Sequence, residues 1–148
     1  MKKRIVFTIL SVLWMGIIFG FSSKEAVESS KDSRSFITST IVNIYKLFDS
    51  DASDEKINDI VEMFNTPVRK LAHFSEYFIL GLLIALTFKA YGINNIYLMI
   101  LFCFLYAVSD EVHQLFVVGR YCSFFDVVVD TLGSSTAITI LKKRRILN

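Results

Sequence analysis

The chain has 148 residues, a net charge of +2 and 53% hydrophobic residues, with a mean hydropathy of +0.52. Two cysteines exclude a disulfide framework, and we expect no nucleic-acid partner. Long apolar runs alternate with short charged stretches, which indicates a small multi-pass membrane protein with a single domain.

The first apolar run covers about residues 5–21 and follows Lys2, Lys3 and Arg4. Basic residues before an apolar run also occur in signal peptides, but this run is long for one. No small-x-small cleavage site stands out before Lys24. We therefore predict that the run is retained as the first membrane span.

Residues 23–65 form the polar part of the chain, and their acidic excess fits an outer loop. Apolar residues recur near helical spacing in 36–48 and again in 57–64, with Ser53 as a predicted N-cap of the second group. We predict one or two amphipathic helices that lie on the membrane surface or cover a site. The alternative is that they simply pack on the spans.

Thr66 and Pro67 predict a helix start, because a capping residue precedes a proline at the first helical position. The three remaining spans are expected at about 71–89, 96–118 and 124–141. Ser123 is the predicted N-cap of the last one. The predicted fold is therefore all-α, with four transmembrane helices.

Basic residues also follow the last span, from Lys142 to Arg145. By the positive-inside rule both termini then face the cytoplasm, which requires an even number of spans. We predict a multi-pass protein of the cytoplasmic membrane. In this topology the start of the second span, the end of the third and the start of the fourth all lie outside.

Polar and ionisable side chains gather at those three outer ends. A charge in the bilayer core costs at least ~2.5–3.5 kcal/mol, so such groups persist mainly when they are paired or functional. Arg69, His73 and Glu76 share one helix face because they are four and three residues apart. Gly133 and Ala137 form a small-x-x-x-small pattern that allows another helix to approach closely.

Three stretches, RKLAHFSEYFILGLL, SDEVHQLF and GRYCSFFDVVVDTLGS, strongly resemble the VanZ-like family of bacterial membrane proteins. WMGIIFGFSS resembles the opening of that family, whereas the central loop matches poorly. The family takes its name from a protein associated with resistance to the glycopeptide antibiotic teicoplanin. The resemblance therefore implies a role in the cell envelope.

The resemblance also places the polar positions of the family on residues of this chain. They are Arg69, Lys70, His73, Glu76, Tyr77, Asp110, Glu111, Gln114, Arg120, Asp126 and Gly133. Two departures stand out: Val118 where the family commonly has proline, and Asp130 where it commonly has asparagine.

Several chemistries suit this group of side chains. His73, Glu76, Asp110 and Glu111 are candidate catalytic residues, in which a carboxylate orients a histidine base. Three serines, Ser75, Ser109 and Ser123, are candidate nucleophiles without a recognisable elbow motif. A divalent metal held by His73, Glu76 and Asp110 is the alternative cofactor hypothesis, although no HExxH spacing appears.

Substrate binding is predicted for a further set, in which arginine would hold a phosphate by a bidentate fork. This set is Arg69, Lys70, Tyr77, Gln114, Arg120, Asp126 and Asp130. His113 is assigned to packing or an interface.

A purely structural network of ion pairs is the competing interpretation. Three bases, Arg69, Lys70 and Arg120, would face five acids, which are Glu76, Asp110, Glu111, Asp126 and Asp130. The excess of two acids favours a site that handles a ligand.

We predict an envelope-associated function of the VanZ type, which lowers the action of glycopeptide antibiotics, with a membrane lipid or lipid-linked cell-wall precursor as partner. One alternative is a metal- or histidine-dependent membrane hydrolase or transferase that acts on a lipid-linked phosphate substrate. Another is a non-catalytic accessory protein that binds a partner through its outer amphipathic helices.

Overall fold

The computed structural model describes residues 1–24, 31–32, 34–40, 42 and 54–147. Within these residues there are four long helices and no strand. The helices are α1 (Lys2–Ser22), α3 (Asp54–Ala90), α4 (Ile96–Gln114) and α5 (Phe124–Lys143). All four are long and apolar enough to cross a membrane. The chain is therefore an all-α, multi-pass membrane protein, as predicted.

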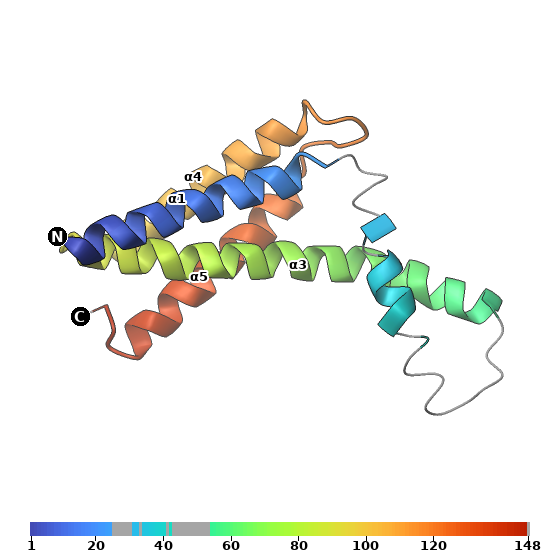
Figure 1. Cartoon of the computed structure of the whole chain (residues 1–148), viewed down its shortest axis with the longest axis horizontal. Coiled ribbons are helices and arrows are strands. Elements are labelled where there is room, and N and C mark those ends of the chain that lie inside the picture. The colour runs from blue at the N-terminus through green and yellow to red at the C-terminus, as the bar shows by residue number, and fades with distance from the viewer. Residues whose placement is uncertain (25–30, 33, 41, 43–53, 148) are drawn as a thin grey trace.

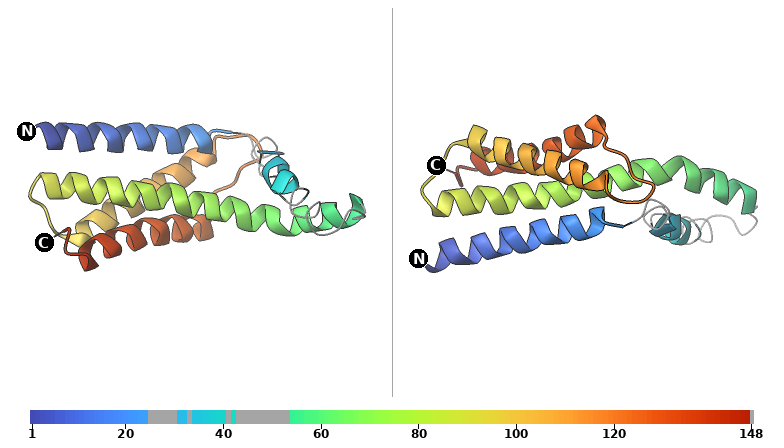
Figure 2. Two further views of the ribbon diagram at one scale, coloured as in Figure 1. Left: turned by 60° about the horizontal axis from the view of Figure 1, so that its bottom comes forward. Right: turned by 90° about the horizontal axis from the view of Figure 1, so that it is seen from above.

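The four helices form one bundle around α3, which contacts each of the other three (Figure 1). Both termini lie at the same end of this bundle (Figure 2), which agrees with an even number of spans. The other end brings together the C-terminal ends of α1 and α4 and the N-terminal end of α5. We call it the polar end, because most buried charged residues lie there.

The predicted helix start at Thr66 and Pro67 is wrong, because both residues lie inside α3. The helix begins at Asp54 and includes residues 57–64, which we had assigned to a separate amphipathic helix. The 37 residues of α3 span about 55 Å, whereas the hydrocarbon core of a bilayer is about 30 Å thick. The N-terminal part of α3 therefore extends beyond the bundle (Figure 1). Pro67 removes one backbone hydrogen bond inside α3, and the helix continues through it.

The other predicted amphipathic helix, over 36–48, is not confirmed as a helix on the membrane surface. Residues 34–40 are helical and cross the extended part of α3 (Figure 1), but most of 41–53, including Ser53, lies outside the described residues. Arg34 forms an ion pair with Glu62 of α3. The described part of this segment thus packs on α3.

The third helix ends at Gln114 rather than near residue 118. The amides of Leu115, Phe116 and Val117 each donate to the carbonyl three residues earlier, so the last turn tightens and the chain reverses. Phe116 in this turn is 83% exposed and lies on the surface of the bundle. Apolar residues thus continue past the end of α4, which made the predicted span too long. Ser123 caps α5 as predicted, since its Oγ accepts from the amide of Asp126 at 3.3 Å.

The closest packing in the bundle joins α3 to α5. A Cβ atom built on Gly133 would lie 2.4 Å from the carbonyl oxygen of Phe74, and one on Gly81 would lie 2.5 Å from that of Ser134. These distances leave no room for any side chain at either glycine. The small-residue pattern predicted at Gly133 and Ala137 is therefore confirmed, and Ala137 is fully buried. The matching glycine on α3 was not predicted.

Hydrogen bonds attach α1 to the other helices. Tyr106 donates its hydroxyl to the carbonyl of Met15 at 2.6 Å, and Trp14 donates Nε1 to the carbonyl of Glu76 at 2.9 Å. Because water does not compete inside a bilayer, such bonds commonly hold spans together. They fix the C-terminal half of α1 against the polar end.

Replacement of Gly133 by alanine tests the contact between α3 and α5. The new methyl group would overlap a backbone carbonyl that cannot move without separating the helices, so we expect a loss of about 1–3 kcal/mol in the free energy of unfolding. Thermal melting of the purified protein in detergent measures this. Gly20→Ala is the matched control, because a Cβ there meets nothing within 4 Å. Equal melting of the two variants would contradict the assigned packing.

Candidate functional site

A cavity of about 180 Å³ lies at the polar end of the bundle. Its walls come from the end of α1, from α3, from Asp32 and from the loop after α4. The lining residues are Phe21, Lys24, Asp32, Arg69, Ala72, His73, Glu76 and Arg120. Arg69, His73 and Glu76 line it together because they share one face of α3, as their spacing predicted.

Two arginines face this cavity without a carboxylate partner among the described residues. Arg120 instead donates Nη1 to the side-chain oxygen of Gln114 at 3.3 Å and Nε to the carbonyl of Lys24 at 3.2 Å. Partial burial and the nearby charge of Arg69 lower the pKa of Arg120. Lys24, by contrast, pairs with Asp32 at 2.6 Å. The two guanidinium groups thus form an electropositive wall.

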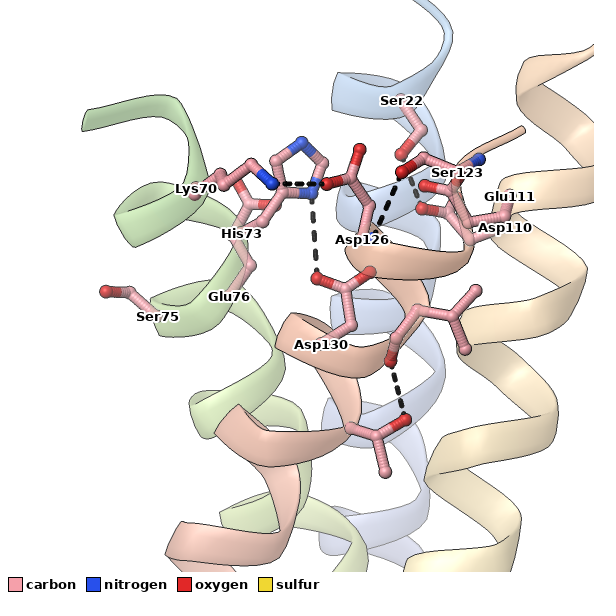
Figure 3. A network of polar contacts seen from close by, with 12 residues as sticks. Ser22, Lys70, His73, Ser75, Glu76, Asp110, Glu111, Ser123, Asp126 and Asp130 are labelled. Atoms are coloured by element: carbon pink, nitrogen blue, oxygen red, sulfur yellow. Dashed lines mark hydrogen bonds and ion pairs between the residues drawn. The ribbon is translucent and has the colours of Figure 1, made fainter. Parts of the chain in front are cut away.

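His73 lies between the cavity and a buried carboxylate. Its Nδ1 is 3.9 Å from Oδ1 of Asp130, which is fully buried on α5. Figure 3 shows Nδ1 on the side of the ring that faces Asp130, with the other ring nitrogen on the far side. Neither oxygen of Asp130 accepts a hydrogen bond from any residue that the structure describes. The histidine is therefore the partner of this carboxylate.

Lys70 and Asp126 form a second contact between α3 and α5, one turn closer to the polar end. The Nζ atom of Lys70 is 3.5 Å from Oδ1 of Asp126 (Figure 3). Both side chains are partly exposed, so water screens their charges. The ion pair therefore contributes little to the free energy of unfolding. It lies beside the cavity but does not line it.

Asp110 and Glu111 do not line the cavity, although the sequence placed them among the catalytic candidates. Asp110 is fully buried and accepts a hydrogen bond from Oγ of Ser22 at 2.7 Å. Glu111 accepts from the amide of Ser123 at 2.7 Å and from Nε2 of Gln114 at 3.0 Å. These two carboxylates connect α4 to the end of α1 and to the start of α5.

Tyr77 and His113 also lie away from the cavity. Tyr77 is fully buried, and its ring centroid is 6.0 Å from that of Tyr106. His113 stacks on Phe19 with 4.7 Å between ring centroids, and its Nε2 is 3.0 Å from Oγ of Ser23. These contacts agree with packing or an interface as the role of His113.

The proposed metal set of His73, Glu76 and Asp110 is not assembled. Among the described residues, no three His, Cys, Asp or Glu side chains come close enough together to hold a metal ion. Asp110 does not line the cavity as the other two do, and its carboxylate accepts a hydrogen bond from Ser22 of α1.

The contribution of α1 was missed by the sequence-based assignment. Ser22 binds Asp110, while Phe21 and Lys24 line the cavity. The signal was present in the stretch WMGIIFGFSS, whose resemblance to the family opening extends to these serines.

The family model described as VanZ/LLP1 matches residues 7–147, which include all four helices from the first turns of α1 onward. Neither the curated proteins nor the solved structures gave a match. Because the family model matches nearly the whole chain, the chain belongs to the VanZ/LLP1 family.

Proposed function

We propose that this protein binds the phosphate group of a lipid-linked envelope component in the cavity at the polar end. The observation that carries the proposal is the pair of arginines, Arg69 and Arg120, which converge on one cavity without a carboxylate partner among the described residues. Beside the pair formed by Lys24 and Asp32, two guanidinium groups face only one cavity carboxyl, that of Glu76.

Guanidinium groups bind phosphate strongly because their planar donors match two of its oxygens. A cation that is partly removed from water and left without a counter-charge is costly, so a bound anion would relieve that cost. Among the described residues no acid of the polar end forms an ion pair with either arginine, although the charges of Glu111, Asp110 and Asp126 act on Arg120 from further away. Asp126 and Asp130 contact Lys70 and His73 instead. The two arginines are therefore available for a ligand.

The size and place of the cavity favour a lipid head group. Its volume of about 180 Å³ is below the roughly 300–1,000 Å³ of pockets that enclose a drug-sized ligand. A phosphate group would fit, while the rest of a lipid would stay in the bilayer that surrounds the apolar helices. Phe21 and Ala72 in the wall give an apolar path toward the lipid.

The family and the charge distribution connect this site to the cell envelope. Basic residues gather at the end of the bundle that holds both termini, so the positive-inside rule turns the polar end outward from the bacterial cytoplasmic membrane. A protein that holds a lipid-linked wall precursor there would change what a glycopeptide antibiotic encounters. This is the sense in which we propose a VanZ-type contribution to glycopeptide resistance.

The orientation can be tested with a cysteine that the chain already contains. Cys122 is exposed in the loop between α4 and α5, whereas Cys103 is buried. A membrane-impermeant maleimide should therefore label the protein in intact bacterial cells, because the outward orientation exposes Cys122 to the medium. Cys122→Ser is the control and should remove the label. Labelling that requires broken cells would reverse the proposed orientation.

Replacement of Arg69 tests phosphate binding. Dioleoyl phosphatidic acid in detergent micelles is the probe, and dioleoyl phosphatidylcholine is the lipid control. We expect Arg69→Gln to weaken phosphatidic acid binding by about 10-fold or more, because one charge-assisted pair is lost. Arg144→Gln, at the opposite end of the bundle, should bind as the unmodified protein does. Equal affinities for the two variants, measured by microscale thermophoresis, would refute the phosphate site.

A susceptibility assay tests the link to resistance. In a bacterial host made less sensitive to teicoplanin by expression of this protein, Arg69→Gln should restore sensitivity because the head group is no longer held. Arg144→Gln at equal membrane abundance should not. Sensitivity that does not differ between these two variants would separate the cavity from the resistance phenotype.

A further inference from the structure

We infer that the cavity is a hydrolytic centre, in which His73, oriented by Asp130, takes a proton from a water molecule that attacks the bound phosphate. The substrate class is a lipid-linked phosphate ester or phosphoanhydride. This inference rests on the proposed binding of phosphate in the same cavity, and it adds a reaction to that binding.

The position of His73 meets the first requirement for a general base. Its ring lines the cavity, while Nδ1 is 3.9 Å from Oδ1 of Asp130 on the other side. The second nitrogen, Nε2, lies on the side of the ring away from Asp130 (Figure 3). The tautomer with its proton on Nδ1 points a donor at the carboxylate and leaves the Nε2 lone pair for a proton from water. Catalytic hydrogen bonds are often long without substrate and shorten when it binds.

Among the described residues, His73 is the one side chain that lies within ion-pair distance of the Asp130 carboxyl group. Asp130 is fully buried inside a membrane-spanning helix, and neither carboxylate oxygen accepts a hydrogen bond from a described residue. The oxygens of Glu111, by contrast, accept from the amide of Ser123 and from Gln114. A buried carboxylate beside a histidine stabilises the imidazolium that forms when His73 takes a proton.

We assign water as the nucleophile, because no hydroxyl or thiol of a described residue lines the cavity. The three serines considered from the sequence are committed elsewhere. Ser75 and Ser109 donate to the carbonyls of Leu71 and Tyr106, and Ser123 caps α5. Figure 3 shows Ser75 pointing away from His73. Water is the simplest nucleophile that this cavity admits.

The reaction balances with water as the only co-reactant. The oxygen of water forms a bond to phosphorus as the bond from phosphorus to the leaving oxygen breaks. Nε2 of His73 takes the proton of that water and returns it to the leaving oxygen. Arg69 and Arg120 hold the phosphoryl oxygens and stabilise the negative charge of the transition state. The products are a lipid alcohol or lipid monophosphate and inorganic phosphate.

Phosphate release by the purified protein in detergent tests this proposal. The probes are farnesyl pyrophosphate and dioleoyl phosphatidic acid. We expect release from at least one of them, with His73→Gln lowering kcat by about 10²–10⁴-fold, the usual contribution of general acid–base catalysis. Affinity for the probes should change little. His113→Gln is the matched control, since it replaces the other histidine, which lies on α4 away from the cavity.

Asp130 is a positioning residue, so its test separates kcat from KM. Asp130→Asn keeps the shape of the side chain but removes the charge that stabilises the imidazolium. We expect a lower kcat with an unchanged KM. For a His73→Ala variant that remains folded by its melting curve, added imidazole should restore part of the turnover. An effect of Asp130→Asn on KM alone would overturn its positioning role.

The outcomes separate this inference from the proposed function. If the unmodified protein binds the probes but releases no phosphate, the hydrolytic centre is refuted and the binding site stands. If neither probe binds, the proposed function fails as well. Turnover by His73→Gln at the unmodified rate, or an equal loss in His113→Gln, also overturns the role of His73. If His73→Gln does not fold, rescue of His73→Ala by imidazole decides the question, and its absence counts against the inference.

Discussion

Close backbone contact between α3 and α5 determines how the helices of this bundle are arranged. Gly81 lies against Ser134, and Gly133 lies against Phe74, at distances that admit no side chain. In a bilayer, association of helices relies on such close packing, because apolar burial gives little advantage over contact with lipid. The contact fixes both the separation and the register of the two helices. His73 is thereby placed opposite Asp130, and Lys70 opposite Asp126.

The polar groups at one end of the bundle divide into two sets once this register is fixed. One set holds helices together: Asp110 binds Ser22 of α1, and Glu111 binds the amide that begins α5. The other set faces the cavity and includes Arg69, Arg120 and His73. Glu111 and one oxygen of Asp110 find their hydrogen-bond partners in this set without using arginine. This is why the acid excess in the sequence coexists with an electropositive cavity in the structure.

Asp130 is where this chain departs from the asparagine that its family resemblance led us to expect. Asparagine could accept a hydrogen bond from the ring of His73, but it would not stabilise the charged imidazolium. Aspartate offers an acceptor oxygen and, when ionised, a negative charge, and its Oδ1 lies 3.9 Å from Nδ1 of His73 without a hydrogen bond in this structure. The substitution has a physical meaning only because α5 brings this position within 3.9 Å of His73. A family resemblance identifies such a position but does not show which side chain contacts it.

Features that depend only on neighbouring residues could be predicted from the order of the amino acids. Hydropathy gave the four spans, spacing put Arg69, His73 and Glu76 on one face, and the cap at Ser123 followed from residue type. Tertiary structure decided the rest. Pro67 did not begin a helix, because the periodic residues before it continue α3 and pack against the segment around Arg34. Three bases and five acids allow many pairings, and the close packing of α3 on α5 brings together the pair of Lys70 and Asp126. The sequence therefore predicted where the polar residues gather. It did not predict which charges pair, because pairing depends on distances between helices.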